Sequence, residues 1–190
     1  MQKIILASQS PRRKQLLQWA EIDFEVQVSQ ADESFPAYMP VEEVPIFIAL
    51  NKAKAVQQKN SNAIILAADT VVVLHNEIIN KPVDREDAIR ILRSLSGNQH
   101  RVITGVVLLH NQEEISFADI TYVTFHHLTD EQIFFYVDKY KPYDKAGAYA
   151  IQEWIGVTGI KAINGDFYNV MGLPVSRVVQ QINKLQLQEF

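Results

Sequence analysis

The chain has 190 residues, a formal net charge of −4 and no cysteine. This length suits one compact domain, so we expect residues 1–190 to fold as a single domain. The lack of cysteine excludes disulfides, cysteine-ligated zinc and thiol nucleophiles, which leaves oxygen and nitrogen groups for any catalysis. The negative charge argues against nucleic acid or an anionic membrane as a partner.

Neither a membrane-spanning segment nor a secretory signal is evident. The apolar runs, such as residues 63–68, are much shorter than the roughly 18 residues that a membrane span requires. Lys3 precedes only a short apolar run before Ser8, whereas a signal peptide has a longer apolar region. We therefore expect a cytoplasmic protein with no membrane partner.

The first third of the chain begins with a strand, a helix and a second strand. An apolar run predicts a buried strand over residues 3–7, and amphipathic spacing predicts a helix over 11–20. Alternating residues predict a strand over 23–28. Residues 29–43 are acidic, contain prolines and lack periodicity, which is typical of a binding loop or lid. An apolar stripe then predicts a helix over 46–56.

The middle of the chain is rich in predicted strands. Aliphatic residues predict a strand over 63–74, which a tight turn joins to residues 77–79 as a hairpin. A helix follows from its cap at Asp84 to Leu95. Two long strands are then predicted over 101–110 and 115–128.

The last third combines helices with a further hairpin. A helix is predicted over 129–140, and a hairpin of residues 160–163 and 167–171 is predicted around Asn164-Gly165. A final amphipathic helix runs over 173–185. Because helices and strands interleave while the hairpins are antiparallel, the pattern indicates an α/β fold with a mixed sheet.

Cations crowd the first turn of the first predicted helix. Ser10 is a favourable N-cap and Pro11 suits the first helical position, so Arg12, Arg13 and Lys14 occupy that turn. The helix dipole is positive there and disfavours each cation by about 0.3–1 kcal/mol. A bound polyanion would reverse the sign of this effect.

Two interpretations of these cations remain. In the first, free N–H groups, the guanidiniums and the hydroxyls of Ser8 and Ser10 bind phosphate, and a triphosphate is the natural ligand. In the second, the cations extend into water or pair with acids such as Glu21 or Glu25.

Asp69 interrupts an apolar strand and shares a face with Ala67 and Val71. An unpaired charge there would cost several kcal/mol, so Asp69 needs a partner. A metal ion, a catalytic water or a cationic side chain can serve, and hydrogen bonds to backbone amides at a strand end are the alternative.

Other acids and lysines gain interest only in combination with Asp69. Asp32 and Glu33 lie in the irregular loop, and two carboxylates around Mg²⁺ or Mn²⁺ would hold a phosphate chain and activate water. Lys52 and Lys81 can neutralise charge on phosphates, although lysines at such positions are usually solvated.

The common catalytic and nucleotide-binding motifs are absent. The sequence contains no GxxxxGK[ST], GxGxxG, GxSxG or HExxH. We therefore assign structural roles to the histidines, which are His75, His100, His110, His126 and His127. The last two are adjacent in a predicted strand and would point to opposite faces.

Several segments together are specific. They are LASQSPRRKQLL, ALNKAKA, LAADTVV, NKP, SGNQHRVITG, DKAGAYAIQ and FYNVMGLP, with Glu33 in addition. With them the chain resembles the Maf family of nucleoside triphosphate pyrophosphatases over nearly its whole length. The resemblance implies an elongated mixed β-sheet with flanking helices and two lobes around a cleft, similar to inosine triphosphate pyrophosphatases. It also implies attack of water on the α-phosphorus, with a divalent cation (Mg²⁺, Mn²⁺ or Co²⁺) as cofactor.

The resemblance also implies that Arg12, Thr70 and Gln152 set substrate selectivity. Together with the local chemistry it leads us to expect phosphate binding by Ser8, Arg12, Arg13 and Lys14, charge stabilisation by Lys52 and Lys81, and metal binding by Glu33 and Asp69. Asp69 is in addition the expected proton acceptor.

The segment KAGAYAIQ resembles the branch of the family that acts on dTTP and UTP. The Gln152 amide offers a donor and an acceptor, which match the N3–H and a carbonyl of thymine or uracil but not cytosine. Glu153-Trp154 follows where the family often has glycine. A 7-methyl-GTP pyrophosphatase and a non-catalytic, nucleotide-binding regulator of septum formation are the alternatives. The resemblance further suggests a homodimer.

Overall fold

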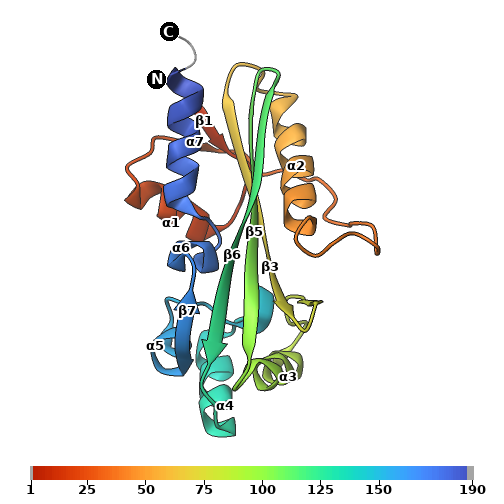
Figure 1. Cartoon of the computed structure of the whole chain (residues 1–190), viewed down its shortest axis with the longest axis vertical. Helices are drawn as coiled ribbons and strands as arrows, with labels where there is room; N and C mark the ends of the chain where they lie inside the picture. The colour runs from red at the N-terminus through yellow and green to blue at the C-terminus, as the bar shows by residue number, and fades with distance from the viewer. Residues whose placement is uncertain (1, 188–190) are drawn as a thin grey trace. The chain divides into compact units, whose positions relative to one another are not determined.

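A computed structural model describes residues 2–187 of the chain (Figure 1). Its elements form a mixed α/β fold in which a seven-stranded sheet has the order β2-β1-β3-β5-β6-β7, with β4 paired to β3. The residues cluster into two compact units. Unit 1 contains the residues up to Asp69, Thr104–Asp119 and the residues from Gly172 on, and unit 2 contains Thr70–Ile103 and Ile120–Met171.

Unit 1 is built on the N-terminal strand. β1 (Ile4–Leu6) pairs in parallel with both β2 (Glu25–Val26) and β3 (Ile64–Leu74), which confirms the predicted first strand. The helices of this unit are α1 (Pro11–Trp19), α2 (Val44–Gln57) and α7 (Val175–Leu187). The long strands β5 (Gln99–His110) and β6 (Glu113–Phe125) contribute residues 104–119.

Packing of α2 on the sheet makes the core of unit 1. Ala49 and Ala53 of α2 are fully buried against Ile65 and Ala67 of β3, and Figure 1 shows α2 beside β3 and β5. A Cβ atom on Gly105 of β5 would lie 2.2 Å from the Ile46 backbone nitrogen. Only glycine therefore permits this close approach of the first turn of α2.

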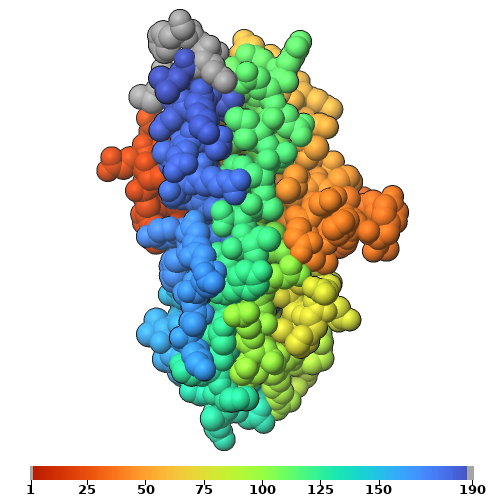
Figure 2. All heavy atoms as spheres, viewed as in Figure 1, coloured from red at the N-terminus to blue at the C-terminus, as the bar shows by residue number. Residues whose placement is uncertain are grey.

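The other side of unit 1 carries α7. Its Arg177 donates a hydrogen bond to the Ala118 carbonyl of β6 at 3.0 Å, and its guanidinium lies 4.0 Å from the centre of the Phe117 ring. Figure 2 shows the surface that α7 and β6 form together.

Unit 2 completes the long strands and adds short elements. They are β4 (Glu77–Ile79), α3 (Arg85–Leu95), α4 (Asp130–Tyr140), η1 (Ala146–Ala148), α5 (Trp154–Gly159), β7 (Ile160–Asn164) and α6 (Phe167–Met171). Val72, Val102 and Val123 form a buried cluster in this unit. The predicted turn into β4 is confirmed, because His75 and Asn76 have φ values of 50° and 65°, which suit a tight hairpin.

Helix starts in unit 2 also agree with the sequence. Asp84 caps α3 by accepting a hydrogen bond from the Asp87 amide at 2.8 Å. Thr129 and Gln132 form a reciprocal capping box at the start of α4. Both helix starts were predicted from the sequence.

Two predicted strands are wrong in extent. The alternating stretch 23–28 forms a strand only at Glu25 and Val26, and both of these side chains are exposed. The strand predicted to end at 128 stops at Phe125. His126 and His127 therefore lie beyond the strand, where both are exposed, and not on its opposite faces.

The predicted hairpin of 160–163 with 167–171 is also wrong. Residues 160–164 do form a strand, but β7 pairs antiparallel with β6. Residues 167–171 form the helix α6, which starts where the Asp166 carboxylate accepts a hydrogen bond from the Tyr168 amide at 2.8 Å. The helix α5 and the turn η1 were not predicted, because neither has a full amphipathic period.

None of the helices formed by residues 2–187 has the length and apolar character needed to cross a membrane.

Candidate functional site

The turn after β1 leads into the cationic start of α1. Ser10 is the N-cap, as predicted, and its hydroxyl accepts from the Arg13 amide at 3.5 Å. The Ser8 hydroxyl accepts from the Ser10 amide at 3.2 Å. Arg12 and Lys14 are half-buried on the same turn. The predicted N-cap is therefore confirmed, while phosphate binding at this turn stays a prediction.

Arg13 is buried, with 8% of its surface exposed. Its Nε donates to the Gly172 carbonyl at 2.8 Å and its Nη1 donates to the Ser8 hydroxyl at 3.2 Å. Burial lowers the pKa of Arg13, while the charge of Asp69 acts against this shift. The interpretation in which this side chain extends into water is wrong, because Arg13 holds the turn after β1 to the backbone before α7.

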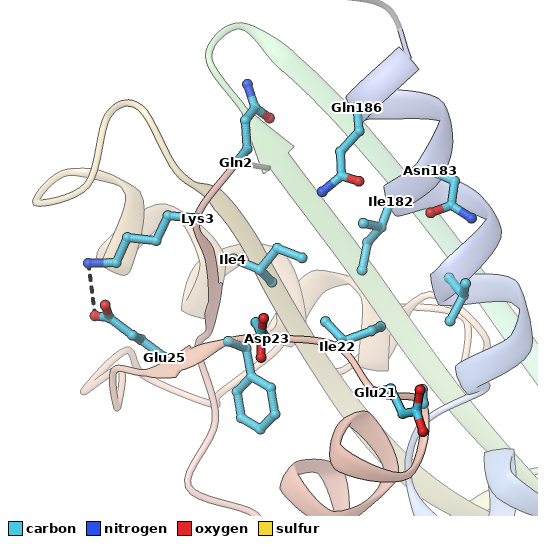
Figure 3. Close-up of a pocket in the computed structure, with 13 residues that line it drawn as sticks. Gln2, Lys3, Ile4, Glu21, Ile22, Asp23, Glu25, Ile182, Asn183 and Gln186 are labelled. Atoms are coloured by element: carbon cyan, nitrogen blue, oxygen red, sulfur yellow. Dashed lines mark ion pairs between the residues drawn. The ribbon is translucent and has the colours of Figure 1, made fainter.

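Glu25 was one of the acids considered as a partner for the α1 cations. It pairs instead with Lys3, at 2.8 Å. Nearby, a pocket of about 530 Å³ lies among β1, the α1–β2 connection and α7 (Figure 3). Its lining carries Glu21, Asp23 and Glu25 against the single cation Lys3, so it does not suit a polyanion.

The partner of Asp69 is Lys52. The Lys52 Nζ lies 2.7 Å from Asp69 Oδ1 and 2.8 Å from Glu33 Oε1. Only 13% of the Lys52 side chain and 16% of the Asp69 side chain are exposed, whereas Glu33 is 59% exposed. Two carboxylates thus converge on one ammonium, and the cationic side chain is the alternative that the structure supports for Asp69.

Separate elements position these three groups. Asp69 follows Ile65 and Ala67 on the face of β3 that packs against α2, and Lys52 projects from α2. Glu33 belongs to the loop 29–43, which contains turns but neither helix nor strand, as predicted. Asp32 accepts hydrogen bonds from the Ser34 amide at 2.9 Å and the Ser34 hydroxyl at 2.5 Å.

The Asp32–Ser34 turn holds the backbone on both sides of Glu33. The same hydrogen bonds from Ser34 hold the pKa of Asp32 below its ordinary value. Sequence reasoning missed this positioning role of Asp32, although an aspartate two residues before a serine is a recognisable signal for such a turn.

Glu33 and Asp69 fit a hard divalent cation. Both present carboxylate oxygens to one cationic position, and Mg²⁺ is typically held by one or two carboxylates while waters and phosphates complete its coordination. Within residues 2–187 there is no group of three or more acidic or histidine side chains arranged around a metal position.

The remaining predicted residues belong to unit 2. Thr70 follows Asp69 on β3, with its side chain on the opposite face. Lys81 is exposed between β4 and α3. Gln152 is exposed in the turn between η1 and α5. Their roles in the site stay predictions.

His100 has a structural setting, as expected. It is buried, and its Nε2 lies 2.7 Å from the Tyr149 hydroxyl, while its ring stacks on Phe125. Burial lowers the pKa of His100 to about 4, so this imidazole is neutral at physiological pH. Burial also raises the pKa of the Tyr149 phenol.

Comparison with known proteins gives consistent matches. The family described as Maf-like protein matches residues 3–185. A protein named dTTP/UTP pyrophosphatase from Cytophaga hutchinsonii is 49% identical over 182 residues, which are 96% of this chain and 84% of the relative. A protein of the same name from Porphyromonas gingivalis is 48% identical over 185 residues, 95% of this chain and 92% of the relative.

Among solved structures, the Ham1 protein of Staphylococcus aureus is similar to this chain. The match covers 65% of this chain and 71% of the Ham1 chain, with a TM-score of 0.48 and 14% sequence identity.

Proposed function

Since the chain belongs to the Maf-like protein family, we propose that it hydrolyses nucleoside triphosphates, with dTTP and UTP as its substrates. The products are the nucleoside monophosphate and pyrophosphate. The observation that carries this proposal is the position of the Lys52 ammonium between the carboxylates of Glu33 and Asp69. The names of the similar proteins from Cytophaga hutchinsonii and Porphyromonas gingivalis support the choice of substrate.

The start of α1 binds the phosphates in this proposal. The Ser8 hydroxyl and the side chains of Arg12 and Lys14 donate to phosphate oxygens. Arg13 contributes positive charge and, through its hydrogen bond to Ser8, holds that hydroxyl in place. A polyanion bound there stabilises the helix start that its own cations destabilise.

Asp69 acts as the proton acceptor. Water forms a bond to the α-phosphorus, the bond from that phosphorus to the bridging oxygen breaks, and pyrophosphate leaves. The water proton passes to the Asp69 carboxylate, whose Oδ1 is oriented by Lys52. Lys52 and Lys81 stabilise the negative charge that develops on the phosphate oxygens.

Glu33 and Asp69 would hold the divalent cation, Mg²⁺, Mn²⁺ or Co²⁺. When bound, it neutralises phosphate charge and lowers the pKa of water. The Lys52 ammonium compensates both carboxylates.

Gln152 selects the base in this proposal, together with Thr70 and Arg12. The Gln152 amide donates to a carbonyl of uracil or thymine and accepts from its N3–H. Cytosine has an acceptor at N3, so one of the two hydrogen bonds is lost and rejection follows.

The test is to incubate the pure protein with dTTP, UTP, CTP and 7-methyl-GTP and each of the three metals, and to identify the products. We expect pyrophosphate from dTTP and UTP. Orthophosphate would contradict attack at the α-phosphorus, and fastest turnover of 7-methyl-GTP would contradict the substrate choice. Binding without turnover would identify a regulator.

Two further proposals rest on resemblance and composition. We propose that the protein is a homodimer, which light scattering after size-exclusion chromatography tests; the mass of one chain, 21.7 kDa, would refute it. We also propose a cytoplasmic location, which fractionation of the source cells tests.

A further inference from the structure

Gln152 sits on a hydrogen-bonded turn. The Glu153 amide donates to the Ala150 carbonyl at 3.1 Å, so residues 150–153 form a β-turn with Gln152 in its third position. Ala150 and Ile151 are buried at 4% and 3% exposure, while Gln152 is exposed. The orientation of this turn therefore sets the direction in which the Gln152 side chain leaves the backbone.

The hydroxyl of Tyr136 joins both ends of this turn. Tyr136 lies on α4 and is fully buried. Its hydroxyl accepts from the Ala150 amide at 3.1 Å and donates to the Glu153 carboxylate. One oxygen atom thus satisfies the buried N–H at the start of the turn and the charged side chain at its end.

A buried lysine supports the same carboxylate. Lys145 is 8% exposed, and its Nζ lies 3.6 Å from Glu153 Oε1 and 2.7 Å from Asp144 Oδ1. The Glu153 carbonyl also accepts the Gly156 and Val157 amides that begin α5. Glu153 therefore has contacts to α4, to the segment before η1 and to α5.

We propose that Tyr136 and Glu153 are positioning residues for nucleobase selectivity, which they exert by fixing the turn that carries Gln152. This inference rests on the proposed function. Discrimination of uracil from cytosine requires both the donor and the acceptor of one amide to be aligned. A turn released from Tyr136 permits other orientations of that amide, and cytosine then binds nearly as well.

The first test is Tyr136→Phe, which removes one oxygen and keeps the ring and its stacking on Tyr140 at 4.9 Å. The measurement is kcat/KM for UTP and for CTP, with pyrophosphate as the product. We expect the UTP-to-CTP ratio to fall about tenfold, as is typical for the loss of a hydrogen bond to a charged group. The change should lie mainly in KM, because Gln152 does not touch the reacting phosphate in the proposed mechanism.

Tyr140→Phe is the matched control. It removes a hydroxyl from the same helix, one turn away, and should leave the selectivity ratio unchanged. The melting temperature of each variant, followed by circular dichroism, separates altered selectivity from loss of fold.

Glu153 gives a second, independent pair of variants. Glu153→Gln keeps an acceptor for the Tyr136 hydroxyl, whereas Glu153→Ala removes it. We expect the Gln variant to retain more of the selectivity ratio than the Ala variant. This pair keeps the proposal testable if Tyr136→Phe fails to fold.

The outcomes separate the two proposals. If the unaltered protein does not release pyrophosphate from UTP, the proposed function fails at that point. If it does, and folded Tyr136→Phe and Glu153→Ala keep the original UTP-to-CTP ratio, the positioning role of this contact is overturned while the function stands.

Discussion

Removing Lys52 and neutralising Asp69 should have unequal effects on stability, although the two side chains contact each other. In Lys52→Met, Asp69 keeps its charge at 16% side-chain exposure and loses an ammonium 2.7 Å away. Loss of one partner of a buried pair costs about 3–5 kcal/mol. We expect about 3 kcal/mol here, since Glu33 is 59% exposed and water compensates its charge.

Asp69→Asn is the milder change for the fold. The Asn side chain keeps an oxygen that accepts from Lys52, and Glu33 Oε1 still lies 2.8 Å from the ammonium. No charge is left buried without compensation. We expect a loss of about 1 kcal/mol in the free energy of unfolding, which is the ordinary net value of one hydrogen bond.

Catalysis should respond in a different way. Asp69→Asn removes the proton acceptor, so it should abolish pyrophosphate release from dTTP and UTP despite its small effect on stability. Lys52→Met should lose both activity and stability.

Urea denaturation at pH 7, with the free energy extrapolated to water, measures the two stability changes. Pyrophosphate release measures turnover in the same preparations. The electrostatic reasoning is refuted if Lys52→Met is as stable as the parent, or if Asp69→Asn is the more destabilised of the two. Retained turnover in Asp69→Asn would remove it from catalysis.

Three other predictions concern the core, acid stability and the metal. Gly105→Ala should lower stability by about 1–3 kcal/mol in urea denaturation, because its Cβ would lie 2.2 Å from the Ile46 nitrogen; an unchanged midpoint would contradict this contact. The pKa of His100 is lowered from 6.5 to about 4. Between these two pH values the unfolded chain binds more protons than the folded chain, so the free energy of unfolding should fall by about 3 kcal/mol as the pH drops from 6.5 to about 4. His100→Phe should reduce that dependence in thermal unfolding between pH 7 and 4, and an unchanged dependence would contradict the role of His100. Chelation with EDTA should stop turnover, and added Mg²⁺ should restore it. Glu33→Gln should raise the Mg²⁺ concentration needed for half-maximal activity, and an unchanged Mg²⁺ requirement would remove Glu33 from the metal site.

Local signals explain which predictions succeeded. Asp84 and Thr129 mark their helix starts because a capping side chain contacts amides only a few residues away. The failures at 23–28 and 167–171 have the opposite cause, since both segments have strand-like composition. Whether each segment forms a strand depends on the segments that lie beside it in the fold, and those segments are distant in the sequence.

The site shows the same division. Residue types and local order alone predicted the helix start at Ser10, with cations in its first turn, and an Asp69 that needs a partner. The choice of Lys52 as that partner, and the burial of Arg13 against the Gly172 carbonyl, were decided only in the folded chain. Local hydrogen bonds and periodicity are encoded within a few residues, whereas the pairing of a buried charge depends on which elements pack together, and that is settled by the whole core.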